Sequence, residues 1–507
     1  MMRNTHTTPP HVVVVGAGLG GISAAISLTQ EGYAVTLVDK NPWLGGKLSE
    51  LKLDGYTFDL GPSILTLPQY FERLFERSGK RMRDYFSIRP VRPHWRCVFE
   101  DGDVVDLTPE QEVMDAQLRA LGEDPKNFQR FLDYSARLYD LTAEGYFEQG
   151  LDTSEEFRQF YGLWKFPEFD LLRNMHQGVG RFMRTRKMRD ILDFFIKYVG
   201  SSALRAPAFM NSMPTIQFRY DLWYVDGGMA NIARGLGRLL DELGVNVRLG
   251  TDIVRIEKRD GRVHGVVVDG GERIDADIVV SNMEVIPTMR HLLGEEPEHV
   301  AKMERKFAPS CSGLVIDLGL DRQYPQLAHH NFFFSKHQKK HFDSVFRRQQ
   351  LPEDPTIYLV AASRTDPTVA PEGCDCLKIL PHIPHLDDAQ TLSQQDYLDY
   401  KDVILEKLER MGLENLRQHI RTEHVLTPYD IQERYRSNRG SIYGVVTDRF
   451  KNLGFKAPKQ SDRYENLFFV GGSVNPGPGM PMVVLCGQNV ARKVVEWQGG
   501  TASAAAA

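Results

Sequence analysis

A glycine-rich loop follows the first apolar run of the chain. Gly16, Gly18 and Gly21 have the spacing G-x-G-x-x-G within the segment Gly16-Ala17-Gly18-Leu19-Gly20-Gly21. The first glycine permits a tight turn, the second lets a phosphate approach the backbone, and the third lets the next helix lie close to the strand. Free N–H groups at the start of that helix attract negative charge. The loop therefore predicts a pyrophosphate-binding site.

The segments around this loop are those needed to position it. Residues 11–15 and 34–38 are short, β-branched runs that predict two buried parallel strands. Apolar residues between them recur as in a helix packed on a sheet, and Gly32 ends that helix. Asp39 follows the second strand, where its carboxylate can accept hydrogen bonds from ribose hydroxyls. Strand, loop, helix, strand and acid together favour a dinucleotide-binding unit over a plain glycine turn.

A second glycine pair lies just beyond this unit. After Lys40 comes Gly45-Gly46-Lys47, in which the glycines let the backbone pass near a diphosphate and the lysine brings a positive charge. This element resembles the second fingerprint of the FAD-dependent amine-oxidase and carotenoid-desaturase superfamily. Arginine is usual there, so Lys47 offers a point charge without a bidentate fork. NAD dehydrogenases lack the element, and the resemblance therefore implies FAD.

Later segments predict returns to the same domain. Residues 223–229 open an amphipathic helix over 230–243, and strands are expected at 245–249, 251–257 and 278–282. Residues 467–482 predict a strand, a glycine turn and a helix N-terminus suited to the N1–O2 edge of a flavin. Four glycines before that helix favour this interpretation over a plain turn. The cofactor contacts expected there are Gly472, Ser473, Met480, Pro481 and Met482.

The predicted fold class is α/β, with three parts and a tail. A Rossmann-like FAD-binding domain is expected from residues 11–95, 222–300 and 455–497, and an α+β substrate-binding domain from 301–454. Residues 96–221 predict a helical insert that faces substrate and a membrane. Residues 498–507 are expected to be a disordered tail.

The predicted insert is rich in aromatic residues, and 173–187 is locally basic. The aromatic residues could form core, or a pocket or membrane-facing surface. The basic residues could form a solvated helix face or attract anionic lipid headgroups.

Composition limits the classes of partner and the cellular compartment that we expect for this protein. The chain of 507 residues has a net charge of −5, which argues against a nucleic-acid partner. Five cysteines and a polar N-terminus without a signal peptide indicate a cytoplasmic protein. The run from residue 12 to 28 is too interrupted for a membrane span, so membrane contact is expected to be peripheral, at the inner face. The spacings of the cysteine and histidine pairs do not favour a metal site.

From about residue 12 to 495 the chain resembles bacterial FAD-dependent carotenoid desaturase-type flavoproteins. The segments at 55–63, 327–330 and 370–373 carry this resemblance. It implies that Gly61, Pro62 and Ser63 lie near the flavin and that the backbone at Ile253 touches the adenine.

Within that family, the resemblance is greatest to the oxidases that act on the terminal methyl groups of thirty-carbon carotenoids. Segments that carry it lie at 59–66, 195–202, 222–225, 281–288, 324–334, 436–440 and 472–476. True desaturases have His-Gly-Ser-Ala near 437–441, where this chain has Ser-Asn-Arg-Gly-Ser. They have Thr-His-Pro at 474–476, where this chain has Val-Asn-Pro. Both differences favour the oxidase.

The resemblance implies oxidation of a terminal methyl group through the alcohol to the aldehyde. Oxidised FAD would accept a hydride from the allylic methyl, water would capture the resulting polyene cation, and O2 would reoxidise the flavin or supply the oxygen atom. A hydrocarbon substrate offers no charge, so an apolar tunnel that opens toward a membrane is expected. His329, His330 and Arg439 are candidates for orienting the methyl group, and a structural role for each stays open. A carotenoid desaturase, a non-catalytic FAD-binding paralogue and an amine oxidase are the alternatives.

Overall fold

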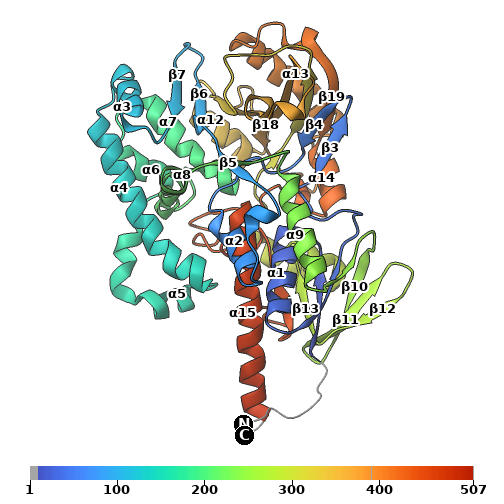
Figure 1. Ribbon diagram of the computed structural model, residues 1–507. Helices are drawn as coiled ribbons and strands as arrows, with labels where there is room; N and C mark the ends of the chain where they lie inside the picture. Colours follow the sequence, from blue (N-terminus) through green and yellow to red (C-terminus); the bar gives the residue numbers. More distant parts are fainter. Residues whose placement is uncertain (1–8, 390, 506–507) are drawn as a thin grey trace.

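The computed structural model describes residues 9–389 and 391–505. A five-stranded parallel sheet lies in the lower half of the molecule, with the strand order β20-β13-β1-β2-β9 (Figure 1). Its strands come from distant parts of the chain: β1 (His11–Val15), β2 (Ala34–Val38), β9 (Asn246–Arg248), β13 (Ile278–Ser281) and β20 (Leu467–Phe469). The strand, helix and strand predicted at the start of the chain are confirmed, because α1 (Leu19–Gln30) joins β1 to β2.

Both faces of this sheet are covered. On one face lie α1, α9 (Ala230–Glu242) and α15 (Met480–Ala505), and the antiparallel strands β10 (Ile253–Arg259), β11 (Arg262–Val268) and β12 (Arg273–Asp275) cover the other. Helices α1 and α15 pack tightly, since a Cβ added at Gly487 would lie 2.6 Å from the Ala24 nitrogen. Helix α15 also corrects one expectation. Residues 498–505 continue this helix and do not form a disordered tail, and residues 506–507 lie outside the described part.

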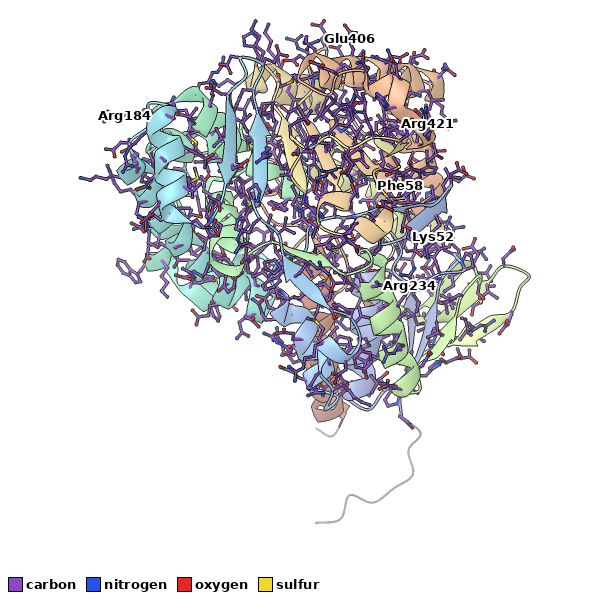
Figure 2. All side chains as sticks on the ribbon, turned by 45° about the horizontal axis from the view of Figure 1, so that its top comes forward. Lys52, Phe58, Arg184, Arg234, Glu406 and Arg421 are labelled. Carbon is purple, nitrogen blue, oxygen red and sulfur yellow. The ribbon has the colours of Figure 1, made fainter. Side chains whose placement is uncertain are left out.

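An eight-stranded mixed sheet forms the upper half. Its order is β19-β15-β18-β17-β16-β6-β7, and β14 pairs with β18. Most of its strands come from the predicted substrate domain: β14 (Ser312–Gly313), β15 (Val315–Leu320), β16 (His330–Phe333), β17 (Ile357–Ala361), β18 (Asp375–Ile383) and β19 (Ile420–Leu426). Figure 2 shows Glu406 and Arg421 at the rim of this half and Phe58 inside it.

The sheet also takes two strands from the segment that we expected to be a helical insert. Strands β6 (Trp95–Val98) and β7 (Val104–Leu107) form a hairpin whose first strand pairs with β16 in parallel. Cys97 and Val105 are fully buried in this hairpin. The insert therefore becomes helical only after residue 107.

The helices of the insert stand beside both sheets (Figure 1). They are α3 (Gln111–Ala120), α4 (Pro125–Thr142), α5 (Ser154–Tyr161), α6 (Met175–Gly180), α7 (Arg186–Phe194) and α8 (Met213–Tyr220). Most aromatic side chains here are core, including Phe131 and Phe169, whereas Trp164 is 93% exposed. Among the described helices, none combines the length and the hydropathy needed to cross a bilayer.

The remaining elements connect these parts. They are β3 (Glu50–Leu53), β4 (Tyr56–Asp59), α2 (Gln69–Glu76), β5 (Ile88–Pro90), β8 (Trp223–Val225), α10 (Val285–Pro287), α11 (Pro297–Lys306), α12 (Gln338–Asp343), α13 (Gln394–Arg410) and α14 (Pro428–Tyr435).

Candidate functional site

A cavity of about 370 Å³ lies at the carboxyl ends of β1 and β2 and extends to the upper sheet. Fifteen of the predicted cofactor residues line it: Gly16, Gly18, Leu19, Gly20, Asp39, Lys40, Gly45, Gly46, Lys47, Gly61, Pro62, Ser63, Ile253, Gly472 and Met480. Five others do not line it: Ala17, Gly21, Ser473, Pro481 and Met482. The fold thus brings together segments that lie more than 400 residues apart.

The two glycine motifs lie against each other at one end of this cavity. The Gly45 N–H donates to the Ala17 carbonyl at 2.8 Å. A Cβ at Gly46 would lie 3.0 Å from the Gly18 Cα, and one at Gly21 would lie only 2.0 Å from the Gly16 carbonyl oxygen. Only glycine fits such approaches, and they leave room above the loop for a phosphate chain.

The Asp39 carboxylate lies at the same end of the cavity as the two glycine motifs. Its carboxylate accepts hydrogen bonds from the Ala17 N–H at 2.6 Å and from the Asn41 N–H at 2.7 Å. Burial raises the pKa of this carboxyl, and the two backbone hydrogen bonds oppose that rise. Each oxygen keeps a free lone pair, so the group can still accept from ribose hydroxyls.

Lys47 has a partly buried carboxylate partner that the sequence did not reveal. Its Nζ lies 3.7 Å from Glu284 and donates to the Ile442 carbonyl at 3.1 Å. Burial lowers the pKa of Lys47 and raises that of Glu284, and their mutual attraction opposes both shifts. Lys47 therefore joins the second glycine motif to the chain after β13 and to the chain after α14, and places one cation in the cavity wall.

The other end of the cavity is held from the upper sheet. Buried Lys378 on β18 donates to the carbonyls of Asp59, at 2.9 Å, and of Gly61. Ser63 lines the cavity, and its buried hydroxyl has no hydrogen-bond partner. Since buried hydroxyls are normally paired, the Ser63 hydroxyl is available to form a hydrogen bond with a polar ligand in the cavity.

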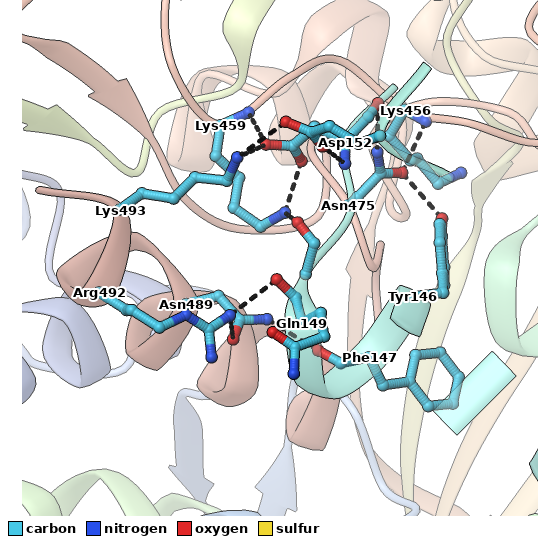
Figure 3. Close-up of polar contacts among 12 residues, drawn as sticks. Tyr146, Phe147, Gln149, Asp152, Lys456, Lys459, Asn475, Asn489, Arg492 and Lys493 are labelled. Atoms are coloured by element: carbon cyan, nitrogen blue, oxygen red, sulfur yellow. Dashed lines mark hydrogen bonds and ion pairs between the residues drawn. The ribbon is translucent and has the colours of Figure 1, made fainter. Parts of the chain in front are cut away.

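A buried polar network anchors the loop between β20 and α15 (Figure 3). The Asn475 side-chain oxygen accepts from the Tyr146 hydroxyl at 2.8 Å and from the Lys456 N–H at 2.9 Å. The Asn475 amide donates to the Asp152 carbonyl at 3.1 Å, and the Asp152 carboxylate binds Lys459 and Lys493. The insert thereby fixes the loop that carries Gly472.

A second, apolar cavity of about 110 Å³ adjoins the first. Pro481 and Met482 line it rather than the first cavity. Its walls include Tyr146, Phe147, Phe209, Met210, Met213 and Ile216. Ile64, Tyr198, Pro478, Gly479 and Met480 line both cavities, so the two meet at these residues.

The three candidate catalytic residues line neither cavity. His329 accepts or donates a hydrogen bond at 2.7 Å to the Thr365 hydroxyl, and His330 pairs with the Tyr358 hydroxyl at 2.9 Å. Arg439 forms ion pairs with Glu304 and Asp388. These contacts give each residue a structural role. No group of three potential metal ligands occurs among the described residues.

Several cavity residues were not predicted. Asn282 touches the glycine loop, since a Cβ at Gly20 would lie 2.7 Å from its side-chain oxygen. Its place after a strand of the parallel sheet is a signal that could have identified it. Lys197, Tyr358, Lys378 and Tyr443 converge from other elements and share no sequence pattern.

The glycine cradle, the acid of the second strand and the unpaired Ser63 hydroxyl fit a dinucleotide with a polar ring system. Residues 19–495 match the model of the family described as flavin containing amine oxidoreductase. The chain belongs to this family. It is an FAD-dependent oxidoreductase, and the FAD prediction is confirmed.

Individual proteins with similar sequences indicate which members of the family this chain resembles. The chain is 56% identical over 486 residues to a 4,4'-diapolycopene oxygenase from Methylomonas sp, covering 96% of this chain and 98% of that protein. It is 46% identical to a 4,4'-diaponeurosporene oxygenase from Staphylococcus haemolyticus, covering 95% and 96%. A putrescine oxidase structure with bound putrescine has a TM-score of 0.65 at 15% identity, covering 97% of this chain and all of that one. That last likeness shows the fold alone.

Proposed function

We propose that the chain oxidises the terminal methyl group of a diapocarotenoid to an aldehyde in carotenoid biosynthesis. The observation that carries this proposal is the apolar cavity that meets the FAD cavity at Tyr198 and Met480. The names of the relatives at 46% and 56% identity support the same reaction.

The apolar cavity suits a hydrocarbon. Its lining is mostly aromatic and aliphatic, so affinity would come from buried apolar area at about 25 cal/mol per Å². A polyene end that entered past Phe209 and Ile216 would reach the flavin side of the FAD cavity at Met480. When bound, FAD supplies the two-electron acceptor for the methyl C–H bond. The surrounding rings would exclude bulk water from the reacting carbon.

Membrane association is part of this proposal. Five exposed apolar side chains lie on two segments, 163–172 and 450–453, and we call them together the apolar patch: Leu163, Trp164, Leu172, Phe450 and Leu453. Arg449 donates to the Leu172 carbonyl at 3.0 Å, which joins the two segments of the patch. Leu453 precedes Gly454, a residue that lines the apolar cavity. A carotenoid could thus leave a bilayer beneath the patch and enter the cavity.

The basic residues nearby contribute less to this docking than their number suggests. Arg173 and Arg181 pair with Asp170, and Lys187 pairs with Asp101 and Asp103. Figure 2 shows Arg184 at the outer edge of the insert. We propose that apolar contact holds the protein peripherally on the cytoplasmic face of the membrane, with O2 as the electron or oxygen acceptor.

Expression in a host that has been engineered to make 4,4'-diaponeurosporene as its only carotenoid tests the reaction. We expect pigments whose mass and reactivity identify a terminal aldehyde. Ile216→Trp, which would fill the apolar cavity, should abolish them while bound FAD persists, whereas Val403→Trp on exposed α13 should not. Additional double bonds would identify a desaturase, and unchanged pigment with FAD bound would identify a non-catalytic paralogue. Either result would overturn the proposal.

A further inference from the structure

One buried amine lies where the two cavities meet. Lys197 lines the FAD cavity beside Tyr198, which lines both cavities. The lysine is 4% exposed. Among the described residues, its Nζ has no hydrogen-bond or ion-pair partner. The three other lysines that line this cavity are occupied, since Lys40, Lys47 and Lys378 donate to backbone carbonyls.

Aromatic rings enclose this amine. Its Nζ lies 4.0 Å from the centre of the Tyr358 ring, 4.9 Å from Tyr198, 5.0 Å from Phe332 and 5.5 Å from Trp95. Ring faces stabilise an ammonium but accept its protons only weakly. The lone pair of the neutral amine is therefore free to accept a proton. The surrounding rings then stabilise the ammonium that forms.

The surroundings of Lys197 make the neutral amine more accessible than it is in a solvent-exposed lysine. Burial and the nearby Lys378 lower the pKa of Lys197 to about 7. The other titratable groups that face it are Tyr198, Tyr358, His330 and His382, and burial keeps both histidines neutral. No carboxylate contributes to the shift of Lys197.

We propose that Lys197 is the base that removes the hydroxyl proton when the terminal alcohol is oxidised to the aldehyde. This inference rests on the proposed function. When bound, FAD would supply the acceptor for the electron pair of the C–H bond that breaks at the alcohol carbon, taken up as hydride. The O–H bond breaks, its proton goes to the Lys197 Nζ, and the C=O double bond forms. The proton passes to solvent after the aldehyde leaves.

The test uses the purified FAD-loaded chain, supplied in detergent micelles with either the methyl carotenoid or its terminal alcohol. Lys197→Met keeps the length of the side chain and removes the base. We expect oxidation of the alcohol to fall by about 10²-fold or more. Oxidation of the methyl group should fall less, so the alcohol should accumulate. Bound FAD and the melting temperature should stay near those of the wild type.

The pH profile and chemical rescue separate a base from a merely structural residue. Wild-type oxidation of the alcohol should rise as pH increases through about 7, because the amine loses its proton there. Lys197→Met should lack this rise, and methylamine should restore turnover in Lys197→Ala, more strongly at higher pH. Equal losses on both substrates, or an unchanged pH profile in Lys197→Met, would overturn the inference. A wild-type protein that left the methyl carotenoid unchanged would instead contradict the proposed function.

Discussion

Gly46 lies directly on Gly18, so a Cβ at position 46 would come within 3.0 Å of the Gly18 Cα. Gly46→Ala should therefore raise the dissociation constant of FAD by about tenfold, or about 1.4 kcal/mol. Gly79→Ala is the matched control, because Gly79 has a similar left-handed φ of +70° against +58° but no atom near its Cβ. Flavin fluorescence titration measures both. An equal loss of affinity in both variants would mean that the contact with Gly18 is irrelevant.

Asp39→Asn tests the expected hydrogen bonds between Asp39 and the ribose of FAD. The change removes the charge that accepts from the Ala17 N–H and, we infer, from the ribose. Hydrogen bonds to charged groups contribute about 1.5–3 kcal/mol, so FAD affinity should fall by at least about tenfold. Asp260→Asn in the exposed β10–β11 turn is the control. Titration that gave the same affinity for Asp39→Asn and wild type would remove Asp39 from the site.

Asp152→Asn tests the buried network of Figure 3. The change leaves the fully buried Lys459 without its carboxylate partner. Breaking such a pair costs about 3–5 kcal/mol in the free energy of unfolding. Asp140→Asn removes the partner of Arg219 in an exposed pair and should cost less than about 1 kcal/mol. Urea unfolding at fixed FAD concentration compares them, and similar costs would refute the role of the network.

Stability should fall in mild acid because of buried histidines. Burial lowers the pKa of His329 and of His341 from 6.5 to about 3. Below about pH 6.5 the unfolded chain binds protons that the folded chain does not, so stability is lost as pH falls from 6.5 toward 3. Each histidine contributes about 1.4 kcal/mol per pH unit. Urea midpoints at pH 7.5 and 5.5 should differ less in His341→Asn than in wild type, and an equal difference would contradict this assignment.

The apolar patch should control binding to lipid. Trp164→Ser with Leu172→Ser removes two side chains that are 93% and 92% exposed. We expect co-sedimentation with liposomes to fall severalfold, while Val113→Ser with Val403→Ser leaves it unchanged. The control pair is also exposed, but lies on α3 and α13. Wild-type protein that failed to sediment with liposomes would end the proposal of peripheral attachment.

The cofactor end of the site was predictable because local rules govern it. Phosphate loops need glycine at fixed spacings, and an acid at the end of the second strand is part of the same unit, so Gly18 and Asp39 could be identified from the sequence. The far end was not predictable. Lys197 matters because Trp95, Phe332 and Tyr358 enclose it, and those residues meet only in the folded chain.

Two predictions from the sequence were wrong, the disordered tail and the start of the helical insert, and each error has a physical cause. The segment 498–505 is rich in alanine and extends a helix that is already formed, so its two glycines do not end it. The hairpin β6–β7 is short and is stabilised as strand by pairing with β16, more than 200 residues later. Local propensity does not reveal such pairing.

Oxidation of diaponeurosporene carrying fully deuterated terminal methyl groups tests the central claim most directly. The purified FAD-loaded chain should give an aldehyde whose carbonyl carbon keeps one of its three deuterium atoms, as mass spectrometry would show. A product that kept all three deuterium atoms in each methyl group and gained double bonds elsewhere would contradict the account.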